Sequence, residues 1–442
     1  MKSSEGQLME WAKKYNFLDK NRPIIERAKY TIVYDVNGKE YIDFTSGQMC
    51  SALGHNHPKI IKAIMESCNT IIHSNNSLYN VYEIELAKKL CEICPEPLKK
   101  AFFLLNGADS NDGAMNVAKR YTDGWEFATP HLGFHGLSGT PRYVTFAVPQ
   151  ANKKFGPAIG SFAMVAPYCY RCLLNLKYPK CDLQCIDLSF TLLDAESVGA
   201  LAGFITEPMF SAGGVFAPPK GWLKKIKQKC DERGMLLILD EAQTGLAKTG
   251  TMFAFETEGV VPDILTISKH FGGGISISAV VTTSEIADTA KKKGFIMSHS
   301  QANDPIGCMA AIASLDIIIE ENMCERAEKV GDKWGQKLTA LYNRYENVGD
   351  VRGKGLIRGI ELVENRKMRK PAQKLGKDIA AESLRNGLIF GSLRGGHILR
   401  FVPPFCTNDD EIEQAYNILN KSFETVLSKR KNLFKSLTNP LT

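Results

Sequence analysis

Four short apolar runs in the middle of the chain end at polar or charged residues. The runs cover 100–105, 201–206, 235–239 and 263–268, and they end at Asn106, Glu207, Asp240 and Lys269. Continuous apolar runs of this length are typical of strands buried on both faces of a parallel sheet. Because open α/β sheets bind ligands beyond the carboxyl ends of their strands, these positions favour a ligand site at one edge of the sheet.

Helical patterns alternate with such runs between about 100 and 285. The predicted helix 220–233 is an example, since Trp222, Ile226 and Cys230 mark a single apolar face. Strands that alternate with amphipathic helices predict an α/β fold with a mostly parallel sheet and right-handed crossovers.

The two ends of the chain carry different patterns. Two alternating runs within 30–44 are joined by Asn37 and Gly38, a strong hairpin signal. Near the C-terminus, a helical stretch at about 305–345 leads into a further unit, and the polar tail from Lys429 is expected to fray. The remaining predicted elements are helices 58–67, 82–93, 372–386 and 409–428 and strands 347–351, 356–362 and 399–402.

Composition limits the classes of function. The 442 residues are 44% apolar and 23% charged, as in ordinary soluble globular proteins. The net charge of +7 is not gathered into a basic patch with interleaved aromatic residues, so no nucleic-acid partner is expected. Since no apolar run approaches the roughly 18 residues of a membrane span, and the first residues lack a signal-peptide core, no membrane partner is expected and the predicted location is cytoplasmic.

Four of the 12 cysteines form a C-x2-C-x8-C-x3-C cluster. Its members are Cys169, Cys172, Cys181 and Cys185. The spacing permits a zinc site, but no histidine ligand lies nearby. Structural thiols are therefore the favoured interpretation, and no metal ligand is assigned.

Lys269 is the leading candidate for chemistry. A strand that delivers a lysine into the glycine-rich turn 270–274 places an amine at the strand end with little bulk around it, which suits a Schiff-base lysine. The turn at Asn106, Gly107 and Ala108 opens a helix that Asp109 or Ser110 could cap. Its backbone N–H groups could cradle a phosphate, although an ordinary strand–helix turn would have the same sequence.

With Asp240, Gln243, Lys269 and the 106–108 turn in place, the chain resembles the class III aminotransferases, which are pyridoxal-phosphate enzymes of fold type I. The likeness runs from about residue 34 to residue 404 and includes Asp-Glu-Ala-Gln-Thr-Gly at 240–245. It implies an α/β fold with a mostly parallel seven-stranded sheet in a large domain (56–315). A smaller α+β domain would be formed by residues 1–55 and 316–442.

The resemblance also implies roles at the cofactor. Lys269 would bind pyridoxal 5′-phosphate covalently and move protons, and Asp240 would pair with the pyridinium nitrogen. Gln243 would contact the phenolic oxygen, and Phe134 would stack on the ring. The phosphate would lie at Asn106, Gly107 and Ala108. A hydroxyl from the partner subunit completes this site in the family; Ser300 matches it, which implies a homodimer or a dimer of dimers with shared active sites.

Within the class, the chain resembles the 2,2-dialkylglycine decarboxylases most. Gln48 matches their glutamine at the departing carboxylate, and Arg400 would bind the substrate carboxylate with two parallel bonds. The likeness implies decarboxylation-transamination of a 2,2-dialkylglycine such as 2-aminoisobutyrate, with pyruvate as amino acceptor. It also implies a monovalent cation near Ser300 and Asp304. The positions that depart from the decarboxylase pattern, all of which line the substrate pocket in that family, are Phe134, Leu137, Ala212 and Ser298.

These departures leave two alternatives open. One is an ordinary class III aminotransferase that acts on an amino acid and a 2-oxo acid. The other is an amino-acid racemase on the same scaffold. A non-enzymatic protein that keeps the fold is disfavoured because Lys269, Asp240 and Gln243 are all present.

Overall fold

The computed structural model describes residues 3–17, 22–148, 159–297 and 299–438, with side chains through Lys431. Its centre is a seven-stranded sheet with the order β4-β10-β9-β8-β7-β5-β6. All neighbours pair in parallel except β10, which runs antiparallel to β4 and β9. The predicted mostly parallel α/β sheet is therefore confirmed. The strands are β4 (Leu98–Leu104), β5 (Glu126–Pro130), β6 (Ser161–Met164), β7 (Leu201–Thr206), β8 (Leu236–Asp240), β9 (Ile264–Ile267) and β10 (Ser278–Thr283).

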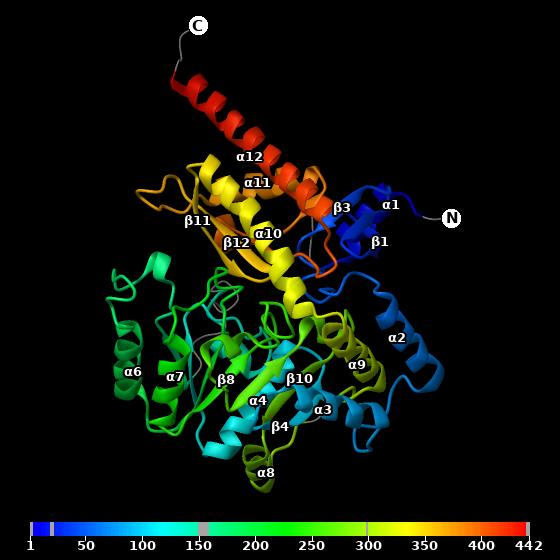
Figure 1. Ribbon diagram of the computed structural model, residues 1–442, viewed down its shortest axis with the longest axis vertical. Helices are drawn as coiled ribbons and strands as arrows, with labels where there is room; N and C mark the ends of the chain where they lie inside the picture. Colours follow the sequence, from blue (N-terminus) through cyan, green and yellow to red (C-terminus); the bar gives the residue numbers. More distant parts are fainter. Residues whose placement is uncertain (1–2, 18–21, 149–158, 298, 439–442) are drawn as a thin grey trace.

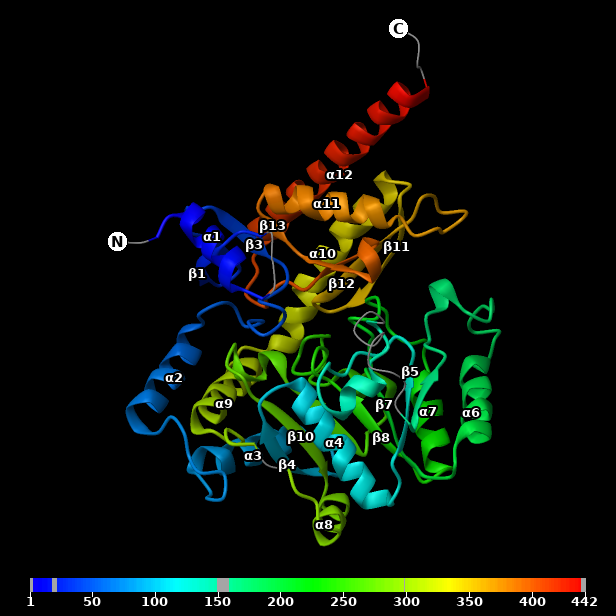
Figure 2. The same ribbon diagram turned by 180° about the vertical axis from the view of Figure 1, so that it is seen from behind.

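The continuous apolar runs form the middle of this sheet. Every residue of β8 and of β9 is buried, because helices cover both faces of the sheet. Helix α4 packs across β7, β9 and β10 on one face (Figures 1 and 2). The helices of this part are α2 (Pro58–Thr70), α3 (Val81–Ile93), α4 (Gly107–Thr122), α6 (Gln184–Glu196), α7 (Trp222–Asp231), α8 (Ser284–Lys292) and α9 (Pro305–Glu320).

Two four-stranded sheets lie above the large sheet in Figure 1 and are formed by strands from the N-terminal and C-terminal parts of the chain. Strand β13 pairs in parallel with β3, so residues near 388 are joined to residues near 42. The first sheet contains β1 (Ile25–Lys29), β2 (Ile32–Asp35), β3 (Glu40–Asp43) and β13 (Leu388–Ile389). The second contains β11 (Val348–Lys354), β12 (Ile357–Leu362), β14 (Gly391–Leu393) and β15 (Ile398–Phe401). Helices α1 (Glu5–Tyr15), α10 (Met323–Arg344), α11 (Gln373–Arg385) and α12 (Asp409–Thr438) accompany them.

The terminal elements agree with the sequence in type and differ in extent. The hairpin around Asn37 and Gly38 is confirmed by the antiparallel pairing of β2 and β3. The helical stretch predicted at 305–345 is two helices, because the backbone takes a left-handed conformation at Asn322 (φ 48°). The tail from Lys429, which the sequence predicts to fray, is the last part of α12, which continues to Thr438. The proposed boundary after residue 315 falls inside α9.

Across the described ranges, no helix is both long and apolar enough to cross a membrane.

Candidate active site

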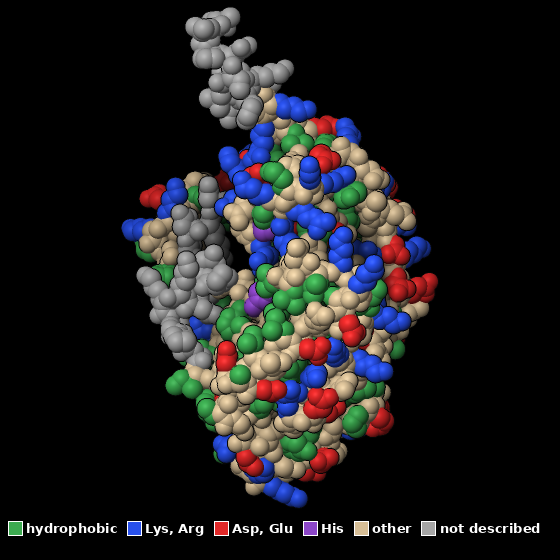
Figure 3. Space-filling model, turned by 90° about the vertical axis from the view of Figure 1, so that its left-hand side faces the viewer, with side chains coloured by type: hydrophobic (Ala, Val, Ile, Leu, Met, Phe, Trp, Pro, Cys, Tyr) green, Lys and Arg blue, Asp and Glu red, His purple; other side chains and the backbone are tan. Residues whose placement is uncertain are grey.

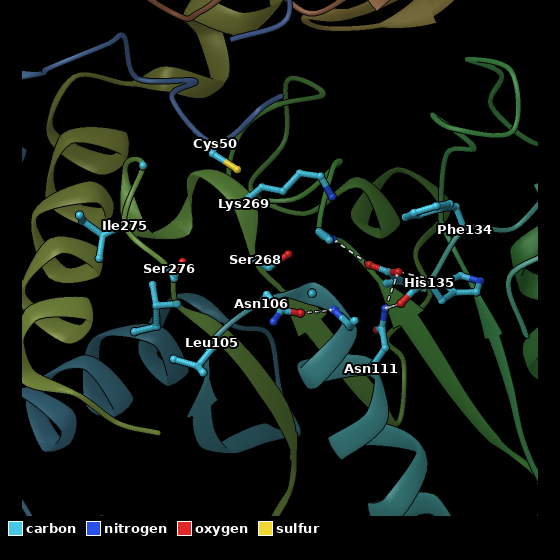
Figure 4. Close-up of a pocket in the computed structure, with 17 residues that line it drawn as sticks. Cys50, Leu105, Asn106, Asn111, Phe134, His135, Ser268, Lys269, Ile275 and Ser276 are labelled. Atoms are coloured by element: carbon cyan, nitrogen blue, oxygen red, sulfur yellow. Dashed lines mark hydrogen bonds and ion pairs between the residues drawn. The ribbon is translucent and has the colours of Figure 1, made fainter. Parts of the chain in front are cut away.

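A cavity of about 290 Å³ lies at the carboxyl ends of β8 and β9, beside the start of α4 (Figure 4). Polar and cationic groups from separate segments face it. The residues that contribute to its wall include Cys50, Asn106, Gly107, Ala108, Asn111, Phe134, His135, Asp240, Ala242, Ser268 and Lys269. The polar ends of three of the four apolar runs therefore meet at one site.

Lys269 lies directly beyond β9 and extends its side chain along the cavity (Figure 4). Its backbone is left-handed, with φ of 53°. Residues other than glycine seldom adopt this backbone conformation, and those that do are often found at functional sites. Burial lowers the pKa of Lys269, although the nearby carboxylate of Asp240 acts in the opposite direction.

Asp240 is 4% exposed and is held from three sides. Its Oδ2 accepts hydrogen bonds from Asn111 Nδ2 (2.8 Å) and from His135 Nδ1 (2.9 Å). Its Oδ1 accepts from the N–H of Ala242 (3.0 Å). Burial would raise the pKa of Asp240, but the hydrogen bond and charge of His135, with Lys269 and this N–H, outweigh burial and keep it below its ordinary value. The site thus contains a fixed, buried carboxylate.

Glu207, at the end of β7, has the opposite protonation preference. Its carboxylate accepts N–H bonds from Phe134 (3.2 Å) and Ser211 (3.1 Å). Burial and the charge of Asp240 raise the pKa of Glu207 to about 8. Two acids at neighbouring strand ends therefore differ in charge at neutral pH.

The start of α4 is capped by Asn106, whose side chain accepts from the N–H groups of Ala108 (2.9 Å) and Asp109 (3.2 Å). The expectation that Asp109 or Ser110 caps this helix was wrong, because Asn106 precedes the first helical residue and has the extended backbone of an N-cap. Backbone and cavity approach closely here. A side-chain carbon at Gly107 would lie 2.8 Å from Ser268 Oγ, so glycine leaves room between the turn and this hydroxyl.

Arg400 is a buried residue of β15 that points toward Gln243. Its Nη1 donates to Gln243 Oε1 (3.2 Å) and to Ser211 Oγ (3.2 Å). Burial lowers the pKa of Arg400 to about 10, so the guanidinium stays charged at neutral pH. Among the described residues, Arg400 forms no ion pair within 4 Å. The charge of Glu207, when that residue is ionised, raises the pKa of Arg400, but burial and the charge of Asp240 raise the pKa of Glu207 to about 8, so this partner is mostly protonated at neutral pH.

Some predicted site residues lie away from the cavity wall. Gln48 is exposed, in a turn where Ser46, Gly47, Gln48 and Met49 all have positive φ. Ser300 is exposed on the loop before α9. Gln243 follows Ala242 of the wall, and Arg400 donates to Gln243, but neither residue is part of the wall. Phe134 is partly buried and lines it.

Several residues of the wall were not predicted from the sequence, among them Cys50, Asn111, His135 and Ser268. His135 follows Phe134 and Ser268 precedes Lys269 in the sequence, so their position next to predicted site residues could have indicated them. Asn111 lies one helical turn beyond the 106–108 turn and faces Asp240. No comparable signal marks Cys50.

The possible metal sites gain no support. Cys169, Cys172, Cys181 and Cys185 have free thiols and line a separate small cavity. Within the part of the chain that the structure describes, no three His, Cys, Asp or Glu side chains are arranged to hold a metal ion. Asp304, implied as a cation ligand, instead accepts a hydrogen bond at Oδ1 from His73 Nδ1 (2.6 Å).

Comparison with known proteins agrees with this geometry. The family described as "Aminotransferase class-III" matches residues 17–423. An uncharacterized aminotransferase of Schizosaccharomyces pombe is 37% identical, covering 90% of each chain. A leucine/methionine racemase of Thermococcus litoralis is 33% identical, covering 91% of each. An (S)-enantioselective omega-transaminase from Thermomicrobium roseum has a TM-score of 0.90 at 27% identity, covering 97% of this chain and all of that one.

The family match spans nearly the whole chain, and the site has a lysine, an ionised aspartate and a helix start around one cavity. The chain therefore belongs to the class III aminotransferase family, whose enzymes depend on pyridoxal 5′-phosphate.

Proposed function

We propose that this enzyme moves an amino group from an amino acid to a 2-oxo acid and that Arg400 binds the carboxylate of both. The observation that carries the proposal is the buried guanidinium of Arg400, which has two neutral partners and no ion pair among the described residues. A buried charge without a counter-ion is costly, and a substrate carboxylate would supply one through charge-assisted bonds. The face shown in Figure 3 carries Lys and Arg side chains interspersed with Asp and Glu, so Arg400 itself, and not a charged surface, supports the proposal.

The residues of the cavity fit the cofactor. Pyridoxal phosphate, when bound, supplies an aldehyde for the amine and a ring that accepts electrons. Lys269 would bind the aldehyde and carry protons, and Asp240 would hold the ring nitrogen in its protonated form. The start of α4 and the open surface at Gly107 suit a phosphate. Phe134 would pack against the ring.

Decarboxylation of a 2,2-dialkylglycine with pyruvate as acceptor stays a prediction. It requires the Gln48 side chain at the departing carboxylate, whereas this side chain is exposed and outside the cavity wall. A carboxylate bound by Arg400 would stay on the substrate, so the proton at Cα would be the group that is lost. Geometry thus favours ordinary transamination, and the racemase relative shows that proton exchange at Cα is also compatible with the scaffold.

The first prediction concerns the carboxylate. Leucine should reduce the absorbance of the lysine-bound cofactor, while 3-methylbutylamine, the same amine without the carboxylate, should react poorly. In Arg400→Gln, KM for leucine should rise by a factor on the order of 10–1000, because a charge-assisted pair is lost. KM for the amine should not change.

The control is Arg358→Gln, on the neighbouring strand β12 with its guanidinium bonded to Asp332. It should leave both KM values as in the wild type. A panel of carboxylated donors replaces leucine if leucine itself is not accepted. Equal effects of Arg400→Gln on acid and amine would contradict the proposal, and CO2 released from 2-aminoisobutyrate with pyruvate would support the decarboxylase instead.

We also propose a homodimer in which Ser300 completes the active site of the other subunit. The loop of Ser300 is fastened to the segment before α3: Asn76 donates to the carbonyl of His299 (2.9 Å), and Asn80 donates to that of Asn303 (3.0 Å). This segment and the start of α3 expose an apolar surface. It consists of Ile71, Ile72, Leu78, Tyr79, Val81 and Ile84, which are between 38% and 86% exposed. Such a surface marks a protein interface.

A mixing experiment tests the shared site. Ser300→Ala should raise the dissociation constant of pyridoxal phosphate roughly 10-fold, as for one lost hydrogen bond to a charged group. In mixed dimers of Ser300→Ala and Lys269→Ala chains, the intact Lys269 would meet the partner's Ser300. One site of each mixed dimer should then bind cofactor as tightly as the wild type. If affinity stays weak, Ser300 does not act across the interface.

A further inference from the structure

Ser268 has a buried hydroxyl that the folded chain leaves unused. The residue is 2% exposed, and its Oγ has no hydrogen-bond partner within the described ranges. It precedes Lys269 and forms part of the wall of the active-site cavity. A buried hydroxyl without a partner is destabilising, so its presence at this wall calls for a group that binds there.

The surroundings of the hydroxyl indicate which group this is. Ser268 Oγ faces the Asn106–Ala108 turn, so closely that a side-chain carbon at Gly107 would lie 2.8 Å from it. The turn opens a helix of 16 residues, whose N-terminus favours an anion. In Figure 4, the Ser268 oxygen lies between Lys269 and Asn106. The Ser268 hydroxyl faces the start of α4 at Gly107, and a phosphate oxygen between them could accept hydrogen bonds from both.

We infer that Ser268 is a positioning residue that donates a hydrogen bond to the phosphate of pyridoxal phosphate. The bond joins the end of β9 to the start of α4 through the cofactor. Because Ser268 and Lys269 are consecutive, anchoring the phosphate also fixes the cofactor's distance from the reactive amine. This inference rests on the use of the cofactor and is independent of the substrate proposed above.

The test compares pyridoxal phosphate with pyridoxal, which lacks the phosphate. Dissociation constants are measured by absorbance titration of the full-length protein after cofactor removal. In Ser268→Ala, the constant for pyridoxal phosphate should rise roughly 10–100-fold, as for a bond to a charged group. The constant for pyridoxal should change less than about 3-fold. Thermal unfolding of the cofactor-free variant should occur at the same or a higher temperature, because an unpaired buried hydroxyl is removed.

Ser278→Ala is a matched control. Ser278 lies on β10, is fully buried and also has an unpaired hydroxyl among the described residues, but it is outside the cavity wall. Its substitution should change neither constant. Ser268→Cys, which keeps the shape with a weaker donor, serves if the alanine variant does not fold, and it should weaken only pyridoxal phosphate. Equal losses of affinity for pyridoxal phosphate and pyridoxal, or no loss for either, would overturn the inference. These outcomes are distinct from a failure of the proposed transamination, because the experiment measures cofactor binding and not turnover.

Discussion

Lys269→Ala is expected to abolish covalent attachment of the cofactor and to lower kcat for amino transfer by a factor on the order of 10³ or more. Two functions are lost together, because the same amine binds the aldehyde and moves the proton, and general acid–base catalysis alone contributes about 10²–10⁴. The lowered pKa of Lys269 increases the fraction of neutral, nucleophilic amine near pH 7. Borohydride reduction followed by peptide mass spectrometry should find labelled Lys269 in the wild type and no label in the variant.

Lys248→Met is the control for removing a buried lysine. Lys248 is fully buried and its ammonium donates to the carbonyl of Pro403 (3.4 Å). Burial lowers the pKa of Lys248 to about 7, so an apolar side chain of similar length should be tolerated there. The control should keep both the label and the turnover. Turnover by Lys269→Ala within 10-fold of the wild type would remove Lys269 from its assigned role.

The sequence predicts the centre of this site well because strand periodicity and chemical type coincide there. Asp240 and Lys269 each follow an apolar run, and parallel neighbours bring their ends together. No pattern of this kind places Gln48. Its turn contains four successive residues with positive φ, and three of them are not glycine, a conformation that residue preferences disfavour. Tertiary packing sets that turn, so the direction of the side chain could not be predicted.

The sequence also does not predict the residues that position Asp240 and line the cavity beside Lys269. Asn111 and His135 are distant from Asp240 in the chain, by 129 and 105 residues, yet both donate to the same oxygen of its carboxylate. Ser268 looks like any polar residue beside a catalytic one until its burial and its missing partner are known. Such roles depend on hydrogen-bond geometry across elements, which periodicity does not encode. Only the resemblance to a family suggests a role for Ser300, and the proposed role involves a second subunit.

Asp240→Asn is expected to lower kcat by a factor on the order of 10²–10³, the loss typical of one misplaced electrostatic group in a catalytic site. The ionised carboxylate would no longer keep the ring nitrogen protonated. The amide also fits its surroundings poorly. Oδ2 now accepts from Asn111 and His135 while Oδ1 accepts from the N–H of Ala242, and an amide has one oxygen for these two places. Either the Asn111 and His135 donors or the N–H of Ala242 would therefore face the NH2 group of the asparagine.

The variant therefore tests charge and structure separately. Its unfolding free energy should fall by about 1–3 kcal/mol for the hydrogen bond lost, measured by urea denaturation. Glu126→Gln is the control: Glu126 is another buried acid of the large sheet, and it accepts from Ser197 (2.6 Å) and Ala200 (3.0 Å) away from the cavity. It should lose comparable stability and keep its kcat. If Asp240→Asn lost stability but not kcat, the carboxylate would be a structural support for Asn111 and His135, and the cofactor ring would have to obtain its proton elsewhere.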